Sequence, residues 1–200
     1  MSLADQDKWN ARYRDGAYAG RRHPTALLAR FAPSLPRGQA LDVACGAGRN
    51  ALFLAEQGFV VDAVDISAEG LARLDDAACA ACADIRTIEA DLESGLPVAT
   101  DGCYDLIVMV RYVNLPLIRE LTGRLGEHGI LVSEQHLKTD QDVVGPRNAA
   151  YRLDPGALLD AVRPLRVHYY REGIVTDPDG SRAALARVVA SGPRAGLLED

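Results

Sequence analysis

The sequence lacks a long apolar run. No stretch of the 200 residues approaches the roughly 20 consecutive apolar residues that a membrane-spanning helix needs. The first residues, Met1 to Asp7, also lack the basic and then apolar plan of a secretory signal. We therefore expect a cytoplasmic protein that has no membrane partner.

Basic residues are few. The chain has 22 Lys and Arg against 28 Asp and Glu, and its formal net charge is -6. Arg21-Arg22 and the scattered C-terminal arginines form no basic stripe of the kind that nucleic acids require. These charges argue against a nucleic-acid partner and favour a small ligand, which is neutral, cationic or an oxyanion held by one or two arginines.

Cysteines are also few, and their spacing is uninformative. Cys79-Ala-Ala-Cys82 is a Cys-x-x-Cys pair, but no second pair follows at zinc spacing. The stretch is rich in alanine, so two thiols on a helix are expected in preference to a metal or redox site. In the expected compartment the four cysteines should not form disulfides.

One stretch, Ala40 to Leu52, organises the rest of the chain. A short apolar run predicts a buried strand, two glycines predict a tight turn, and an apolar-periodic segment predicts a helix. Gly46 and Gly48 allow the backbone to turn sharply and to approach a ligand. The N–H groups and positive dipole end of the following helix also face that ligand.

Two classes of cofactor fit this plan. Gly46-x-Gly48-x-x-Ala51, with Asp65 downstream, matches the dinucleotide fingerprint. Asp42, however, stands inside the strand, where its carboxylate would repel a pyrophosphate and attract a cationic amine. S-adenosylmethionine has such an amine and no phosphate. Asp42 can alternatively satisfy loop N–H groups, and the two roles can coexist.

The segment Leu41-Asp42-Val43-Ala44-Cys45-Gly46-Ala47-Gly48-Arg49-Asn50 resembles motif I of the class I S-adenosylmethionine-dependent methyltransferases. Its Gly-Arg-Asn ending is similar to the tellurite-resistance and thiopurine methyltransferase branch. The resemblance implies the cofactor S-adenosyl-L-methionine and a small-molecule methyl acceptor.

The remaining pattern predicts a doubly wound α/β fold of the Rossmann-like methyltransferase type, with a mostly parallel seven-stranded sheet and a C-terminal antiparallel hairpin. Dinucleotide folds do not share that hairpin. A turn at 126–129 should lead into a fifth strand at 130–133, and residues 134–150 should form a long loop, often a functional lid. We expect one domain, with a lid and helix at 1–36, a core at 37–192 and a tail at 193–200.

The resemblance also implies which residues hold the cofactor. Asp65 ends the second strand, where the family's acidic residue binds both ribose hydroxyls. Asp91 and Leu92 resemble the segment that contacts adenine. Tyr13 either contacts the cofactor or packs on the core as an aromatic staple. The predicted cofactor-binding residues are Tyr13, Asp42, Ala44, Gly46, Ala47, Gly48, Arg49, Asn50, Asp65, Ile66, Asp91, Leu92 and Val110.

The predicted catalytic residues are His23, Arg111, Tyr112 and Arg182. Arg111 and Tyr112 follow the fourth strand, at the edge where open α/β sheets bind ligands. His23 and Arg182 resemble residues of the tellurite-type relatives, although His23 equally fits a solvated loop histidine. Asn114 and His136 were also expected near the reacting methyl group.

Two departures from the family's patterns bear on the acceptor. Ile174-Val175 stand where tellurite-type relatives tend to carry His-Arg, and Val110 to Val113 lack the motif of amino methyltransferases. The predicted activity is direct methyl transfer to a small-molecule nucleophile, including soft sulfur, selenium or tellurium, by a monomer or weak homodimer. An NAD-dependent oxidoreductase and a catalytically silent cofactor-binding module are the alternatives.

Overall fold

The computed structural model describes residues 3–16, 18–35, 37–192 and 194–196. One mixed sheet of seven strands runs through the molecule in the order β3-β2-β1-β4-β5-β7-β6. The strands are β1 (Gln39–Val43), β2 (Val60–Asp65), β3 (Ile85–Glu89), β4 (Tyr104–Val110), β5 (Leu125–His136), β6 (Arg166–Thr176) and β7 (Arg182–Ser191). The first five are parallel, and β7 pairs antiparallel with both β5 and β6.

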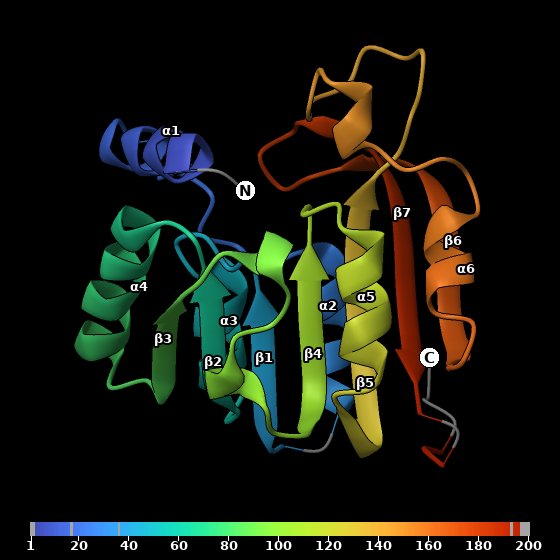
Figure 1. Cartoon of the computed structure of the whole chain (residues 1–200), viewed down its shortest axis with the longest axis horizontal. Helices are drawn as coiled ribbons and strands as arrows, with labels where there is room; N and C mark the ends of the chain where they lie inside the picture. Colours follow the sequence, from blue (N-terminus) through green and yellow to red (C-terminus); the bar gives the residue numbers. More distant parts are fainter. Residues whose placement is uncertain (1–2, 17, 36, 193, 197–200) are drawn as a thin grey trace.

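Helices cover both faces of the sheet, and the N-terminal helix lies beyond the carboxyl ends of the strands (Figure 1). The helices are α1 (Leu3–Arg14), α2 (Ala26–Phe31), α3 (Arg49–Glu56), α4 (Ala68–Ala81), α5 (Leu115–Thr122) and α6 (Ala157–Ala161). Short 3₁₀ turns follow at Ala32–Ser34, Leu92–Ser94, Val98–Thr100 and Ala149–Tyr151. Among the described residues, no helix is long and apolar enough to cross a membrane.

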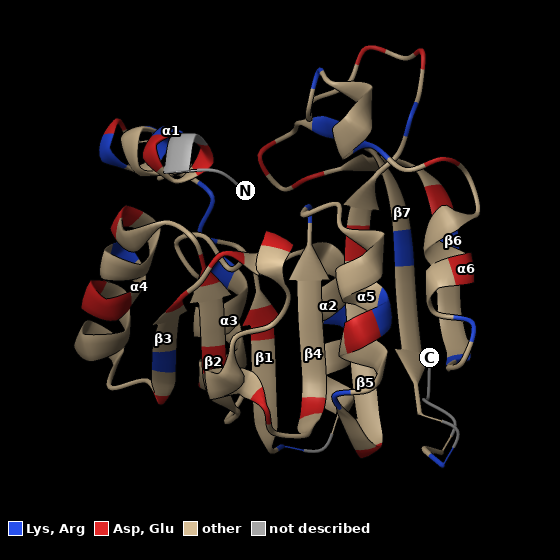
Figure 2. Cartoon of the chain, viewed as in Figure 1, with Lys and Arg blue, Asp and Glu red and all other residues tan. Residues whose placement is uncertain are grey.

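Two apolar layers hold the helices to the sheet. Leu28, Leu54 and Leu74 pack on one face, and Ile118 and Leu158 pack on the other. Alternate residues of each central strand enter the two layers, as the period of a strand requires. Most of the length of β1, β4 and β5 is accordingly uncharged in Figure 2. The predicted doubly wound fold with its terminal hairpin is confirmed.

The fifth strand differs from the prediction. Gly126 to Gly129 belong to β5 and make an irregularity in its pairing with β4, because Leu125 pairs with Tyr104 and Ile130 with Leu106. β5 also continues to His136, since Glu134, Gln135 and His136 pair with β7. The predicted turn at 126–129 and the predicted start of the loop at residue 134 were therefore wrong. Pairing with a strand that comes 50 residues later in the sequence is not visible in local periodicity.

Smaller differences concern element ends. The sequence pattern predicts a helix over 115–125 and a strand over 165–170, whereas α5 stops at Thr122 and β6 extends to Thr176. Cys82 is the left-handed residue that ends α4, so only Cys79 of the pair lies inside the helix. Of the predicted tail, only residues 194–196 lie within the described part of the chain.

Chain order changes direction between β1 and β4. β1 pairs with β2 on one side and with β4 on the other. At such a switch point the loops leave in opposite directions and open a crevice at the carboxyl ends of the strands. In Figure 1, α1, the loop after β5 and the β6–β7 turn all lie beyond this edge. The topology therefore predicts a ligand site at this edge.

Candidate functional site

A cleft of about 890 Å³ opens at this edge. Its floor includes the glycine turn after β1 and the residues that end β2 and β4. Its walls come from α1, from the segment before α2 and from residues 144–148, which we call the strap. The volume lies in the range of small-molecule and cofactor sites.

The glycine turn shapes the floor. Ala44 (φ 55°) and Gly46 (φ 58°) both adopt left-handed backbone conformations. A Cβ at Gly46 would collide with the Tyr13 hydroxyl. Tyr13 is buried, as the staple interpretation requires, and its side chain also lines the cleft. The turn therefore leaves a backbone surface that only glycine provides.

Asp65 links the turn to β2. Its Oδ2 accepts a hydrogen bond from the Gly46 amide at 2.8 Å, and its Oδ1 accepts one from the Ser67 amide at 2.9 Å. Asp65 is 8% exposed and lines the cleft. Burial raises its pKa, and the two amides oppose that shift. Each oxygen retains a further lone pair that can accept a ligand hydroxyl.

Asp42 lies beneath the cleft and outside its lining. It is 1% exposed, and its Oδ2 has no hydrogen-bond partner among the described residues. Burial raises the pKa of Asp42 to about 7, although a hydrogen bond from the Ala51 amide and the charge of Arg49 lower it. The structure thus shows the loop-supporting role of Asp42. Because Asp42 does not line the cleft, the structure does not bring its carboxylate against the predicted position of a cofactor amine.

Gly48 also lies outside the lining. It precedes α3 with φ 76°, and a Cβ there would strike the side chain of Leu74 in α4. Gly48 therefore permits close packing of the turn on α4. The two glycines of the motif therefore differ: Gly46 keeps space beside Tyr13 in the cleft, and Gly48 allows the turn to pack on α4.

Arg49 and Asn50 hold the N-terminal segment over the cleft, and both line it. Asn50 Oδ1 accepts a hydrogen bond from the Thr25 amide at 3.1 Å, and the Arg49 guanidinium donates to the His23 carbonyl at 3.4 Å. The His23 side chain is exposed and outside the lining. Its place favours the solvated-loop interpretation.

The predicted adenine end is divided. Ile66, Ala90 and Leu92 line the cleft. Asp91 does not, because its carboxylate caps a 3₁₀ turn by accepting a hydrogen bond from the Glu93 amide at 3.0 Å. Apolar side chains that could cover a flat ring are therefore present, whereas the Asp91 carboxylate binds a backbone amide.

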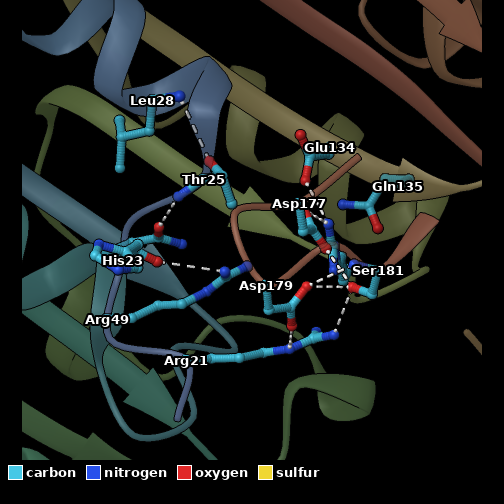
Figure 3. A network of polar contacts seen from close by, with 12 residues as sticks. Arg21, His23, Thr25, Leu28, Arg49, Glu134, Gln135, Asp177, Asp179 and Ser181 are labelled. Carbon is cyan, nitrogen blue, oxygen red and sulfur yellow. Dashed lines mark hydrogen bonds and ion pairs between the residues drawn. The ribbon is translucent and has the colours of Figure 1, made fainter. Parts of the chain in front are cut away.

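A network of ion pairs occupies the other end (Figure 3). Arg111 adopts φ 59° at the end of β4, and its guanidinium donates to Asp177 at 2.7 Å and to Glu134 at 3.4 Å. Its side chain is only 11% exposed. Arg21 reaches the same hairpin turn and binds Asp179 at 3.0 Å and Ser181 at 3.2 Å. These pairs join the N-terminal segment, β4, β5 and the β6–β7 turn.

Tyr112 and His136 complete this end. The Tyr112 hydroxyl donates to Glu93 at 2.9 Å. His136 is 6% exposed, and its Nδ1 is buried with no partner among the described residues. Burial and the charges of Arg111 and Arg152 lower the pKa of His136 to about 4. The imidazole is therefore neutral at pH 7.

Arg147 and Arg182 lie in different places with respect to the cleft. Arg147 belongs to the strap, lines the cleft and makes no ion pair with any described residue. Arg182 is exposed at the start of β7, and its carbonyl accepts a hydrogen bond from Val144 in the strap at 2.8 Å. Its side chain lies outside the lining.

Among the predicted site residues, the cleft is lined by Tyr13, Ala44, Gly46, Ala47, Arg49, Asn50, Asp65, Ile66, Leu92, Val110, Arg111 and Tyr112. His23, Asp42, Gly48, Asp91 and Arg182 lie outside it. Sequence reasoning gave no role to Glu134, Asp177 or Arg21. Glu134 and His136 do alternate, and strand spacing would place them on one side once β5 is known to continue.

Comparisons with known proteins bear on the domain and its fold. Residues 40–127 match a family model described as a methyltransferase domain. Those residues run from β1 into β5 and include the glycine turn, Asp65 and Arg111. The search of curated proteins gave no match.

Solved structures show the same fold. TehB from Haemophilus influenzae is 21% identical with a TM-score of 0.71, and the alignment covers 88% of this chain and 66% of that one. A TehB-like SAM-dependent methyltransferase from Corynebacterium glutamicum is 19% identical with a TM-score of 0.61, over 96% and 100% of the two chains. Magnesium protoporphyrin IX methyltransferase from Synechocystis, solved with bound SAM, is 15% identical with a TM-score of 0.57, over 95% and 80%.

The class I prediction made from motif I is confirmed by the match of residues 40–127 to a methyltransferase domain and by the fold shared with the solved methyltransferases. S-adenosylmethionine is the cofactor of this class, so the cofactor prediction is confirmed as well. Within the described residues, no group of three or more His, Cys, Asp or Glu side chains is arranged to hold a metal ion.

Proposed function

We propose that this protein transfers a methyl group from S-adenosylmethionine to a small molecule bound in the same cleft. The observation that carries the proposal is the continuity of the cleft. A single space of about 890 Å³ joins the glycine turn and Asp65 at one end to Arg111, Tyr112 and the strap at the other. A cofactor and a small acceptor therefore meet without a large rearrangement.

The cofactor end fits S-adenosylmethionine. Gly46 offers a backbone surface without a side chain, and Asp65 keeps lone pairs for two ribose hydroxyls. Ile66 and Leu92 provide apolar cover for adenine. The buried carboxyl of Asp42 lies under the same turn and favours positive charge nearby. When bound, the cofactor supplies an electrophilic methyl group on sulfur.

The acceptor end is polar and nearly charge-balanced. Arg111 is neutralised by Asp177 and Glu134, so its charge is largely committed within the protein. Arg147 and Lys8 line the cleft without an ion pair to any described residue. We therefore assign an anionic or strongly polar group of the acceptor to Arg147, and alignment of that end of the cleft to Arg111. Alignment supplies a large part of the rate enhancement in such a transfer.

Calorimetry and transfer assays test the proposal together. The wild-type protein should bind S-adenosylhomocysteine and should not bind NAD. Methyl transfer to thiol, phenol, selenite, tellurite and aromatic carboxylate acceptors should fall in Arg111→Ala and Arg147→Ala. Arg182→Ala is the comparison, since its side chain lies outside the cleft, and a loss there would restore the role expected from sequence. Binding of NAD would favour the oxidoreductase, and cofactor binding without turnover would favour a silent module.

A further inference from the structure

Among the described residues that line the cleft, His136 stands out as a titratable side chain that is more than nine-tenths buried. Its ring also has a buried nitrogen without a partner among these residues. It is 6% exposed at the end of β5 and lines the cleft. Its Nδ1 is enclosed and has no hydrogen-bond partner among the described residues. Because protein atoms enclose Nδ1, this nitrogen is not the ring atom that meets a ligand.

The ring is held from one side by the strap. An added Cβ at Gly145 would lie 2.8 Å from both Nδ1 and Cε1, so the backbone there is in close contact with the imidazole. Arg152 fixes the strap by donating to the Pro146 carbonyl at 2.7 Å and to the Leu137 carbonyl at 2.8 Å. With the Nδ1 edge enclosed, Nε2 is the nitrogen left for a ligand.

We propose that His136 is a catalytic residue that accepts, at Nε2, the proton of an acceptor whose nucleophile is an O–H or S–H group. This inference rests on the proposed function and specifies its acceptor. The same end of the cleft carries Arg111 and Tyr112, which places the imidazole beside the groups already assigned to the acceptor.

The step balances in atoms and charge. The oxygen or sulfur of the acceptor forms a bond to the methyl carbon, and the carbon–sulfur bond of the donor breaks with its electron pair remaining on sulfur. The acceptor proton passes to His136 and then to solvent. Products are the methylated acceptor, neutral S-adenosylhomocysteine and an imidazolium that later loses its proton.

A weak base is sufficient for this chemistry. The proton on oxygen or sulfur becomes strongly acidic as the methyl bond forms, so a neutral imidazole can take it. An ammonium product is a much weaker acid that a base of this strength would not deprotonate, so His136 gives no advantage to an amine acceptor. The charges facing the ring are Arg111 from β4, Arg152 after the strap, Arg21 from the N-terminal segment and Asp177 from the hairpin turn. Burial and then the three cations keep the resting imidazole neutral, and Asp177 partly offsets them.

The decisive experiment compares acceptors that do and do not carry the proton. Wild type, His136→Gln and the control His168→Gln are assayed with benzyl mercaptan and phenol, which are protonated at neutral pH, and with 4-nitrothiophenol, which is already ionised. His168 lies in β6, binds Ser191 and is outside the cleft lining. We expect His136→Gln to lose about 100-fold in kcat/KM on the protonated acceptors and less than about tenfold on 4-nitrothiophenol.

The outcomes separate the two proposals. Cofactor function is read from S-adenosylhomocysteine binding, which His136→Gln should retain. An equal loss on protonated and ionised acceptors would show that His136 only packs the site, and full activity on both would exclude it from proton transfer. If wild type binds the cofactor but methylates no O–H or S–H acceptor, the acceptor class is wrong. Absence of cofactor binding by wild type would overturn the proposed function itself, and this inference with it.

Discussion

At the scale of single residues, the site depends on two carboxylates with different surroundings. Asp65 is bound by two amides and lines the cleft, whereas Asp42 is fully buried under it with an unpartnered oxygen. Both carboxyl groups have raised pKa values because burial penalises their charge. Their different contacts predict different consequences of substitution.

Asp65→Ala should weaken S-adenosylhomocysteine binding by about 1.5 to 3 kcal/mol, because charged hydrogen bonds to the ribose are lost. Calorimetry on the folded variant measures the change. Asp101→Ala is the matched control, since it removes an exposed carboxylate paired with Arg124 and leaves the cleft intact. Equal affinities of Asp65→Ala and wild type would contradict the ribose assignment.

Asp42→Asn should change the pH dependence of stability. The folded pKa of about 7 lies above the ordinary aspartate value of 3.8, so the native state binds the proton more tightly than the unfolded state. Wild-type stability should therefore fall as the pH rises from about 4 to above 7. Asparagine imitates the protonated group, so the variant should lack this loss, which corresponds to at most about 4 kcal/mol.

Urea unfolding of Asp42→Asn and wild type at a series of pH values tests this expectation. The free-energy difference between the two proteins should move in favour of the variant with rising pH. A difference that does not change between pH 4 and pH 8 would show that Asp42 is ionised throughout.

Gly46→Ala and Gly48→Ala should fail in different ways. Both place a side chain at positive φ, which costs about 1–2 kcal/mol. Gly48→Ala also presses a methyl group into the buried Leu74 side chain, and overpacking adds about 1–3 kcal/mol. Gly46→Ala instead meets Tyr13 in the cleft and should lower cofactor affinity. Unfolding curves and calorimetry on both variants separate the two effects, and identical profiles would refute the division of tasks.

At the scale of elements, the N-terminal segment closes the cleft by contacts with distant parts of the chain. Arg21 binds Asp179 and Ser181 in the β6–β7 turn, and Asn10 Oδ1 accepts a hydrogen bond from the Ser67 hydroxyl at 2.7 Å. Such contacts, exposed or only partly buried, are individually weak. A segment held by several of them can open and reclose, which suits a lid over a reactive sulfonium.

Limited trypsin digestion tests the lid. Cleavage between Arg14 and Arg22 should be rapid without ligand and slower with S-adenosylhomocysteine. Asp179→Ala removes the partner of Arg21 and should increase cleavage in both states. Glu127→Ala removes an exposed ion pair with Arg194 and should leave cleavage unchanged. Cleavage rates that change neither with S-adenosylhomocysteine nor in Asp179→Ala would argue against a lid.

At the scale of the whole molecule, cofactor binding should stabilise the fold. The cleft joins α1, the carboxyl ends of β1, β2 and β4, and the strap, so a bound ligand connects elements from most of the chain. S-adenosylhomocysteine at 100 times its Kd should add about 2.7 kcal/mol to the free energy of unfolding. For a domain of this size that corresponds to a rise in Tm of about 5–10 °C. Calorimetric melts should show this rise, and NAD should give none.

The sequence by itself determined the local elements and the class. The apolar and capping pattern predicts a helix over 68–81 with Ser67 as its N-cap and strands over 85–89 and 104–110, and α4, β3 and β4 have these bounds. These elements are set by neighbours within a few residues: a capping hydroxyl, a run of apolar side chains, a glycine that stops a helix. The glycine turn is likewise a short-range feature, which is why motif I identified the class before any contact was known.

Only the tertiary structure decided what each carboxylate and arginine touches. Arg111 meets Asp177, 66 residues away, and Arg21 meets Asp179, 158 residues away. β5 reaches His136 because β7 pairs with it, and this extension brings the imidazole to the cleft. Asp42 is excluded from the cleft by the packing of the turn above it. Periodicity and spacing report the immediate chain, whereas burial, ion pairing and sheet register arise from segments that meet only when the chain has folded.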